Sequence, residues 1–169
     1  MSVLLTGEER VPMTAAGYEQ RCRELDRLRN DERRRLSGLL RDARGDGALD
    51  DNPTLLDLLD EQAQLERRIA MLEERLAAAD IAPPPSGGRA AIGSVVRVRD
   101  IASEEVFEYE LVGPIEGDAT NGRISIAAPI GRALMGERRG GRVEVVTPRG
   151  RVMLEVLKVA GRSSARKAA

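Results

Sequence analysis

The chain has 169 residues and a net charge of −1, and hydrophobic residues make up 41% of it, charged residues 33% and aromatic residues 2%. It contains no histidine and a single cysteine, which excludes Ser-His-Asp and Cys-His catalysis, histidine-based metal sites and an internal disulfide. The near-neutral charge argues against binding of duplex DNA, which needs a strongly basic surface. No apolar run approaches the ~18 residues of a membrane span, and the N-terminus lacks the pattern of a signal peptide. We therefore expect a cytoplasmic protein without membrane contacts.

A long first helix is predicted after a flexible leader at residues 1–12. Thr14 is a suitable N-cap, because its hydroxyl can accept a backbone N–H of the first turn. From there to Arg44, apolar residues recur in steps of three and four, the spacing of one helical face, with an interruption at Asp31 and Glu32. The apolar residues are Tyr18, Cys22, Leu25, Leu28, Leu36, Leu39, Leu40 and Ala43. Two glycines shortly afterwards are expected to end the helix.

A second helix is predicted to begin at Asn52 and Pro53. Asn52 is a good N-cap, and Pro53 suits the first helical position because its missing N–H has no partner there anyway. The apolar face of this helix consists of Leu55, Leu58, Gln62, Leu65, Ile69, Leu72, Leu76 and Ala79. This spacing is typical of a coiled coil. Because two long helices joined by a short loop fold back on each other, residues 13–81 are predicted to form an antiparallel hairpin.

The second half of the chain has a different pattern. Residues 82–91 contain three prolines and two glycines and are expected to form a linker. Residues 92–160 show the alternation of β-strands, and residues 161–169 are expected to be a disordered tail. Strands are predicted at residues 95–98, 106–112, 123–127, 142–146 and 151–159, with a short helix at 130–135. The predicted fold class is therefore α+β, with a helical hairpin followed by a small, mostly antiparallel, β-rich domain.

Three sequence motifs together resemble a known family. The turn between the helices reads A-R-G-D-G-A-L-D-D-N-P-T-L over Ala43–Leu55, the second helix carries E-Q, E-R-R-I and L-E over residues 61–73, and residues 129–136 read P-I-G-R-A-L-M-G. In this order they resemble the Gre family (GreA/GreB) of bacterial transcript-cleavage factors. That family turns at A-R-x-x-G-D-L-S-E-N-A-E-Y and carries S-P-x-G-R-A-L-L-G in its second domain. The similarity extends over about residues 13–160.

The resemblance implies that the protein acts on another enzyme. Its FKBP-like second domain would dock on RNA polymerase beside the secondary channel, and the hairpin would enter that channel. Acidic residues at the tip would then help to hold a second Mg²⁺, which activates the water that cleaves backtracked RNA near its 3′ end. Mg²⁺ suits this role because it accepts one or two carboxylates and keeps several waters. The implied protein is a monomeric regulator of transcription elongation, not itself an enzyme, with Mg²⁺ held only inside the polymerase active site.

The tip acids depart from the family pattern. Aligned without a gap, the family's first tip acid falls on Ala48 and its second on Asp51, while Asp50 and Asp46 are additional acids in the same loop. Two interpretations follow. Either Asp51, Asp50 and Asp46 rebuild the acidic tip, with Asp50 and Asp51 as ligands of the shared Mg²⁺, or the hairpin occupies the channel without promoting cleavage and inhibits or regulates transcription. A solvated loop whose acids favour the start of the second helix is compatible with either interpretation.

Two further sets of residues are candidates for contacts with the polymerase complex. The resemblance implies that basic residues on the first helix contact RNA or the channel wall. These are Arg33, Arg34, Arg35, Arg41 and Arg44. A charged helix surface paired with neighbouring acids explains the same arginines equally well. The residues expected to dock on the polymerase are Pro129, Ile130, Gly131, Arg132 and Leu134.

Other classes of function fit the sequence less well. A prolyl isomerase, suggested by the FKBP-like fold, needs an aromatic-lined pocket, and residues 83–169 contain only Phe107 and Tyr109 as aromatic residues. A coiled-coil adaptor for a different partner would not need clustered acids at its tip. A polymerase regulator with a truncated hairpin is disfavoured because the heptad spacing continues as far as Ala79.

Overall fold

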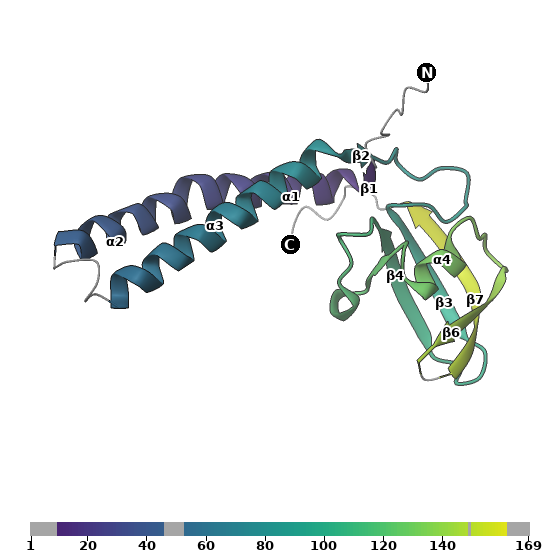
Figure 1. Ribbon diagram of the computed structural model, residues 1–169. Coiled ribbons are helices and arrows are strands. Elements are labelled where there is room, and N and C mark those ends of the chain that lie inside the picture. Colours follow the sequence, from purple (N-terminus) through teal and green to yellow (C-terminus); the bar gives the residue numbers. More distant parts are fainter. Residues whose placement is uncertain (1–9, 46–52, 149, 162–169) are drawn as a thin grey trace, which may run out of the picture. The chain divides into compact units, whose positions relative to one another are not determined.

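The computed structural model of the protein describes residues 10–45, 53–148 and 150–161 (Figure 1). These residues form two compact units. The hairpin unit consists of residues 18–79, and the globular unit consists of residues 10–17 together with residues 80–161. Among the described residues, no helix is both long enough and apolar enough to cross a membrane.

The hairpin unit is built from four consecutive helical segments. They are α1 (Ala15–Arg27), the π-helical turn η1 (Leu28–Glu32), α2 (Arg33–Gly45) and α3 (Pro53–Ala77). The first three form one continuous rod, and α3 runs back along it (Figure 1). Pro53 is the first residue of α3, as predicted, whereas Asn52 lies outside the described residues. The predicted helical hairpin is confirmed.

Two apolar clusters hold the helices together. The first consists of Leu25, Leu28, Ile69 and Leu72, with Leu65 and Leu76 packed against it. The second consists of Leu36, Leu40, Ala43 and Leu55, with Leu58, Leu59 and Leu65 packed against it. Burial of a leucine side chain contributes about 1.5–3 kcal/mol, so these clusters are the main source of hairpin stability.

The π-helical turn explains why the apolar face survives the interruption at Asp31 and Glu32. Leu28 and Leu36, both buried, are eight residues apart, whereas two α-helical turns take about 7.2 residues. A π turn accommodates one extra residue in an otherwise α-helical rod. Leu36 therefore returns to the face that Leu28 occupies, and the acidic pair is accommodated without breaking the core.

One residue of the predicted apolar face is placed differently. Leu39 is 41% exposed, while its neighbours Leu36 and Leu40 are buried. Because Leu36, Leu40 and Ala43 already fill the side of α2 that faces α3, the position at Leu39 is rotated toward solvent. The prediction that Leu39 belongs to the core was wrong.

The globular unit is built around a five-stranded sheet with the strand order β5-β4-β3-β7-β6. The strands are β3 (Ser94–Asp100), β4 (Val106–Val112), β5 (Arg123–Ser125), β6 (Arg142–Thr147) and β7 (Gly150–Gly161). All neighbours are antiparallel except β4 and β5, which are parallel. The 3-10 turn η3 (Ala119–Asn121) precedes β5, and the short helix α4 (Pro129–Leu134) follows it. The predicted α+β fold, with its mostly antiparallel sheet, is confirmed.

The core of the globular unit lies on one face of this sheet and contains almost no aromatic side chains. Its buried members are Ala90, Val96, Val98, Leu111, Leu134, Val145, Leu154 and Val156. Helix α4 contributes Leu134, so it packs on this face. The core is filled by branched aliphatic residues, which suit the pleated surface of a sheet, and Tyr109 packs against its margin.

The boundaries between segments differ from those expected from the sequence. Residues 11–13 form strand β1 (Val11–Met13), which pairs with β2 (Ala79–Ile81), although residues 11 and 12 were expected in the leader. Ala90, expected in the linker, is only 2% exposed and belongs to the globular core. These short segments gain order from partners distant in the sequence, and local composition does not reveal such partners.

Candidate functional site

The acidic residues expected at the hairpin tip lie between the described helices. Helix α2 ends at Gly45 and α3 begins at Pro53, so Asp46, Asp50 and Asp51 are outside the described residues. Within the described part of the chain, no group of three or more Asp, Glu, His or Cys residues is arranged to hold a metal ion. For Asp50 and Asp51, the Mg²⁺ ligands expected from the sequence, the structure therefore gives only the ends of the two helices that flank them in the chain.

Two of the five candidate arginines are engaged in ion pairs across the hairpin. The guanidinium group of Arg33 donates two hydrogen bonds to the carboxylate of Glu66, with N–O distances of 2.8 and 2.6 Å. This bidentate contact holds the pKa of Glu66 below its usual value of 4.5. Arg35 donates to Glu61 at 2.6 Å and to Glu32 at 3.1 Å. Both arginines therefore have carboxylate partners within the hairpin.

The other three candidates, Arg34, Arg41 and Arg44, are exposed and form no ion pair with another described residue. Arg41 and Arg44 lie one turn apart on α2, close to the end of the helix. Their positive charges are favoured there by the helix dipole. They differ from Arg33 and Arg35 in having no carboxylate partner among the described residues.

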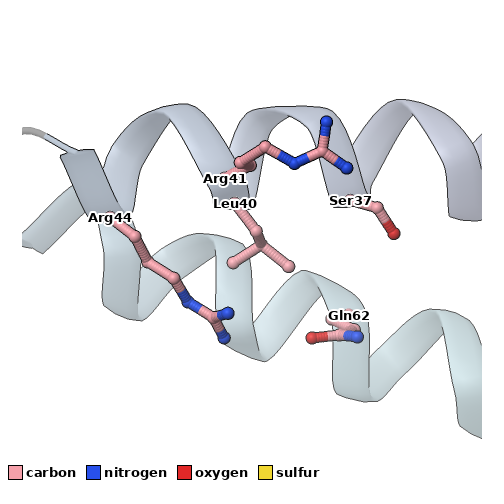
Figure 2. Close-up of a pocket in the computed structure, with 5 residues that line it drawn as sticks. All are labelled: Ser37, Leu40, Arg41, Arg44 and Gln62. Atoms are coloured by element: carbon pink, nitrogen blue, oxygen red, sulfur yellow. The ribbon is translucent and has the colours of Figure 1, made fainter.

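Arg41 and Arg44 border a cavity of about 300 Å³ between α2 and α3, close to the tip. Figure 2 shows Leu40 between the two helices, the long side chain of Arg44 extending toward α3, and Gln62 on the opposite helix. Ser37 completes the lining. Among the described residues, the lining offers two guanidinium groups, an amide and a hydroxyl, and no carboxylate. Such a set of donors suits a phosphate or another oxyanion, because arginine binds these groups in a bidentate way.

Ser37 and Gln62 were not predicted as site residues. The sequence signal for Gln62 was its polar character at a position of the apolar face where leucine or isoleucine would otherwise pack. A polar residue at such a position leaves a gap in the hydrophobic contact between two helices, and here the gap is the cavity. Nothing in the sequence distinguished Ser37.

The part of the hairpin farther from the tip is neutralised by further ion pairs. Arg29 pairs with Glu73 across the hairpin, and Glu24 accepts hydrogen bonds from Arg21 at 2.7 Å and from Arg68 at 2.6 Å. Burial alone would raise the pKa of Glu24, but the two arginines hold it below its usual value of 4.5. Arg41 and Arg44, the two candidate arginines nearest the tip, are thus among those without a carboxylate partner in the described residues.

The candidate docking residues of the globular unit separate into structural and exposed positions. Gly131 and Leu134 are buried, and Leu134 has no exposed surface. A Cβ at Gly131 would lie 2.0 Å from the carbonyl oxygen of Ser125, so only glycine fits this close approach. Pro129 and Arg132 are exposed, and Ile130 is half-buried against the core. A partner could therefore touch Pro129 and Arg132, whereas Gly131 and Leu134 fix the position of α4.

Comparison with known proteins places both units in one family. Residues 11–81 match the family model described as "Transcription elongation factor, N-terminal" (GreA/GreB). Residues 84–161 match the family model described as "Transcription elongation factor, GreA/GreB, C-term". The chain is 41% identical over 131 residues to the transcription elongation factor GreA of Thermodesulfovibrio yellowstonii, covering 76% of this chain and 83% of that protein. It is 38% identical over 152 residues to GreA of Syntrophobacter fumaroxidans, covering 89% and 97%.

A solved structure is also similar in sequence. The crystal structure of GreA factor homolog 1 (Gfh1) of Thermus thermophilus is 33% identical, covers 90% of this chain and 99% of that chain, and has a TM-score of 0.41. Both relatives from Thermodesulfovibrio yellowstonii and Syntrophobacter fumaroxidans are named as transcription elongation factors.

Proposed function

Because the chain belongs to the GreA/GreB family of transcription elongation factors, we propose that it binds RNA polymerase in the cytoplasm as a monomer. The globular unit docks through the exposed residues of α4, and the hairpin enters the secondary channel. The observation that carries the proposal is the occurrence of both family domains in order, over residues 11–81 and 84–161. The protein has no active site of its own and modulates that of the polymerase.

At the tip, Asp50 and Asp51 lend carboxylates to the Mg²⁺ of the polymerase active site, with Asp46 as a third acid nearby. Asp51 aligns with a family tip acid, and Asp50 is its immediate neighbour. Both come shortly before Pro53, the first residue of α3, in the sequence, and are therefore next to a helix N-terminus along the chain. Carboxylates are favoured at that position by the helix dipole and are ligands that Mg²⁺ prefers. When bound, the Mg²⁺ would supply an activated water. The chain would supply the carboxylate oxygens of Asp50 and Asp51 as ligands.

The cavity beside the tip supports contact with the 3′ end of the nascent RNA. Arg41 and Arg44 are exposed and border a space whose described lining contains hydrogen-bond donors and Leu40 but no carboxylate. The RNA backbone presents one phosphate for every nucleotide, and arginine recognises phosphate through paired N–H groups. We assign Arg41 and Arg44 to the RNA, with Arg34 as a further candidate, whereas Arg33 and Arg35 act first in holding the hairpin together.

The proposal is tested with backtracked elongation complexes in the presence of Mg²⁺. Shortened RNA appearing on addition of the factor is the expected result. The double variant Asp50→Asn/Asp51→Asn should bind polymerase normally and lose at least tenfold in its effect on transcription, equivalent to ~1.4 kcal/mol. The matched control is Asp57→Asn/Asp60→Asn, which removes two charges farther along α3. A double variant at positions 50 and 51 that behaves like the wild type would show that the tip acids are only a solvated cap.

A second candidate function is regulation by occupancy of the channel without cleavage. The observation that favours it is Ala48, which stands where the family has its first tip acid. The same assay separates the two functions, since a channel-occupying inhibitor slows RNA synthesis without shortening the RNA. A pull-down that recovers no polymerase and instead retains duplex DNA would contradict both candidates.

A further inference from the structure

A cluster of exposed arginines lies next to helix α4 in the globular unit. Arg89 and Arg138 face each other in an isolated antiparallel β-bridge, and Arg139 follows Arg138 in the chain. We call Arg89, Arg138 and Arg139 the arginine patch. All three are exposed, and none forms an ion pair with a described residue of the chain.

The backbone holds the patch in a defined arrangement. The N–H of Ala90 donates to the carbonyl of Glu137 at 2.8 Å, and the N–H of Gly136 donates to the carbonyl of Ala90 at 2.7 Å. The guanidinium of Arg89 donates to the carbonyl of Gly136 at 3.2 Å. Ala90 is buried in the core, so the chain that carries Arg89 is anchored at this place. The arginines are therefore presented from an ordered support.

A tight turn presents the third arginine. The N–H of Gly141 donates to the carbonyl of Arg138 at 2.9 Å, and Gly140 has a φ of +85°. This combination is typical of a type II turn with glycine at its third position. Arg139 occupies the second position of the turn, where a side chain projects into solvent. The turn thus places the positive charge of Arg139 next to Arg138, which pairs with Arg89 in the β-bridge.

This arrangement has an electrostatic cost, and no ion pair with a described residue offsets it. Like charges placed directly opposite each other across a pair of strands are destabilising. Elsewhere in the same unit, exposed Arg142 pairs with Glu155 at 3.6 Å and exposed Arg151 pairs with Glu144 at 3.3 Å, whereas exposed Arg97 and Arg132 form no ion pair with a described residue. The arginine patch has no such partner among the described residues. An acidic surface on a binding partner would remove the cost.

The surroundings favour a protein over a nucleic acid as that partner. Next to the patch along the chain, Met135 is 37% exposed and Pro129 and Arg132 are exposed. Methionine and arginine are enriched at protein–protein interfaces. Single-stranded bases stack on aromatic rings, but the patch contains none: the aromatic residues of the described globular unit, Phe107 and Tyr109, lie on strand β4 and stack on each other.

We propose that the arginine patch binds an acidic protein surface of RNA polymerase beside the contact made by α4, and that it accelerates association with the polymerase. The inference rests on the proposed function. Clustered charges mainly raise the association rate, and they do so more strongly at low salt. The patch would make docking of this chain dependent on ionic strength although its net charge is only −1.

The test compares two charge reversals of equal size in the full-length chain. Arg138→Glu/Arg139→Glu removes most of the patch. The control, Arg97→Glu/Lys158→Glu, changes the net charge by the same amount at two exposed, directly paired positions of β3 and β7. Circular dichroism establishes that both variants are folded. Association with core polymerase is then followed by stopped flow at about 50 mM and about 500 mM salt.

We expect the patch variant to associate at least tenfold more slowly than wild type at low salt, with the difference shrinking at high salt because charges are then screened within a few ångströms. The control should change by less than about threefold, because its two charges lie outside the proposed contact and act only through the overall field of the protein. Equal slowing of both variants, or no slowing of the patch variant, would overturn the inference. So would a loss confined to binding of a 20-nucleotide single-stranded RNA probe by the free factor. If the wild type itself fails to bind polymerase, the proposed function fails as well, and the two failures are thereby distinguished.

Discussion

The hydroxyl of Thr14 donates a hydrogen bond to the carboxylate of Glu116, which lies 102 residues later in the chain. The same carboxylate accepts the backbone N–H groups of Thr14 and Gly113, each at 2.9 Å. Thr14 in turn accepts the N–H of Gly17 at 2.9 Å, as an N-cap residue does. Glu116 is only 2% exposed, so this buried carboxylate joins the first turn of α1 to the loop after β4, both within the globular unit.

Replacement of Glu116 should destabilise the globular unit. In Glu116→Ala, two buried backbone N–H groups and the Thr14 hydroxyl lose their acceptor, and an unsatisfied buried donor costs about 1–3 kcal/mol. Glu116→Gln should cost less, because its amide oxygen can still accept both N–H groups. Urea unfolding monitored by circular dichroism measures the loss. The exposed Glu108 provides the control, since Glu108→Gln should unfold like the wild type. Equal stability of the Ala variant and the wild type would show that water replaces the carboxylate.

The N-cap role of Thr14 was predicted from the sequence, but its partner Glu116 was not. A cap is local, because the hydroxyl bonds to a backbone group three residues ahead. The contact with Glu116 depends on how β4 and its loop are placed, and local patterns carry no information about that. The glycines at 17 and 113 would have been the only hint: a Cβ at Gly17 would lie 1.6 Å from a carboxylate oxygen of Glu116, and one at Gly113 would lie 2.0 Å from the carbonyl oxygen of Pro12.

Deletion of one residue from the π-helical turn should be tolerated. Without Asn30, Leu28 and Leu36 would be seven residues apart, close to the ~7.2 residues of two α-helical turns. Both leucines would then stay on the face that packs against α3. We expect the free energy of unfolding to fall by no more than about 1 kcal/mol, since Asn30 is exposed and the extra residue of a π turn is the one removed.

Deletion of Ala63 is the matched control, because α3 has no π turn. It would rotate Leu55 and Leu58 by about 100° relative to Ile69 and Leu72. At ~1.5–3 kcal/mol for each leucine that leaves the core, this variant should be much less stable in urea than the variant lacking Asn30. Similar losses in both variants would mean that the π turn is not what keeps the two apolar clusters in phase.

The stability of the hairpin should depend on pH through Glu24. Its pKa is lowered in the folded state, because the hydrogen bonds from Arg21 and Arg68 outweigh burial. A lowered folded pKa contributes stability above the usual value of 4.5, and this contribution is lost as the pH falls through the folded pKa. Thermal midpoints of the wild type and of Glu24→Gln should therefore differ at pH 7 and converge as the pH falls through the lowered folded pKa of Glu24.

Glu19 supplies the control for that measurement. Its contact with Arg23 is 3.7 Å long, and both side chains are about 70% exposed. Exposed pairs of this kind contribute little to stability, so Glu19→Gln should follow the wild-type curve at every pH. A constant difference between Glu24→Gln and the wild type from pH 7 to pH 3 would show that packing, and not charge, accounts for the effect of Glu24.

Nothing in the sequence pattern separates the five candidate arginines, although it locates all of them on the first helix. Which of them is paired depends on which acids of α3 lie opposite, and that follows from the register of the two helices. Glu66 faces Arg33 and Glu61 faces Arg35, whereas Gln62 lies across from Arg41 and Arg44 at the cavity. One π-helical turn in the first helix shifts this register by a residue, and Asp31 and Glu32 indicate only that the apolar stripe is interrupted.

This division between paired and available arginines predicts opposite behaviour of two double variants. Arg41→Gln/Arg44→Gln should leave the thermal midpoint of the hairpin nearly unchanged, because neither arginine has a described ion-pair partner. Its effect on backtracked elongation complexes, whether cleavage or inhibition, should fall about tenfold, equivalent to ~1.4 kcal/mol. Arg33→Gln/Arg35→Gln should lower the midpoint slightly, because it removes the bidentate hydrogen bonds to Glu66 and the hydrogen bond to Glu61 across the hairpin. At saturating concentration of folded factor, it should change the effect on transcription by less than about threefold, since these two guanidinium groups are already engaged by carboxylates of the hairpin. If both double variants lose activity equally without a change in midpoint, the arginines act as one undivided basic surface, and the cavity between α2 and α3 has no separate role in binding RNA.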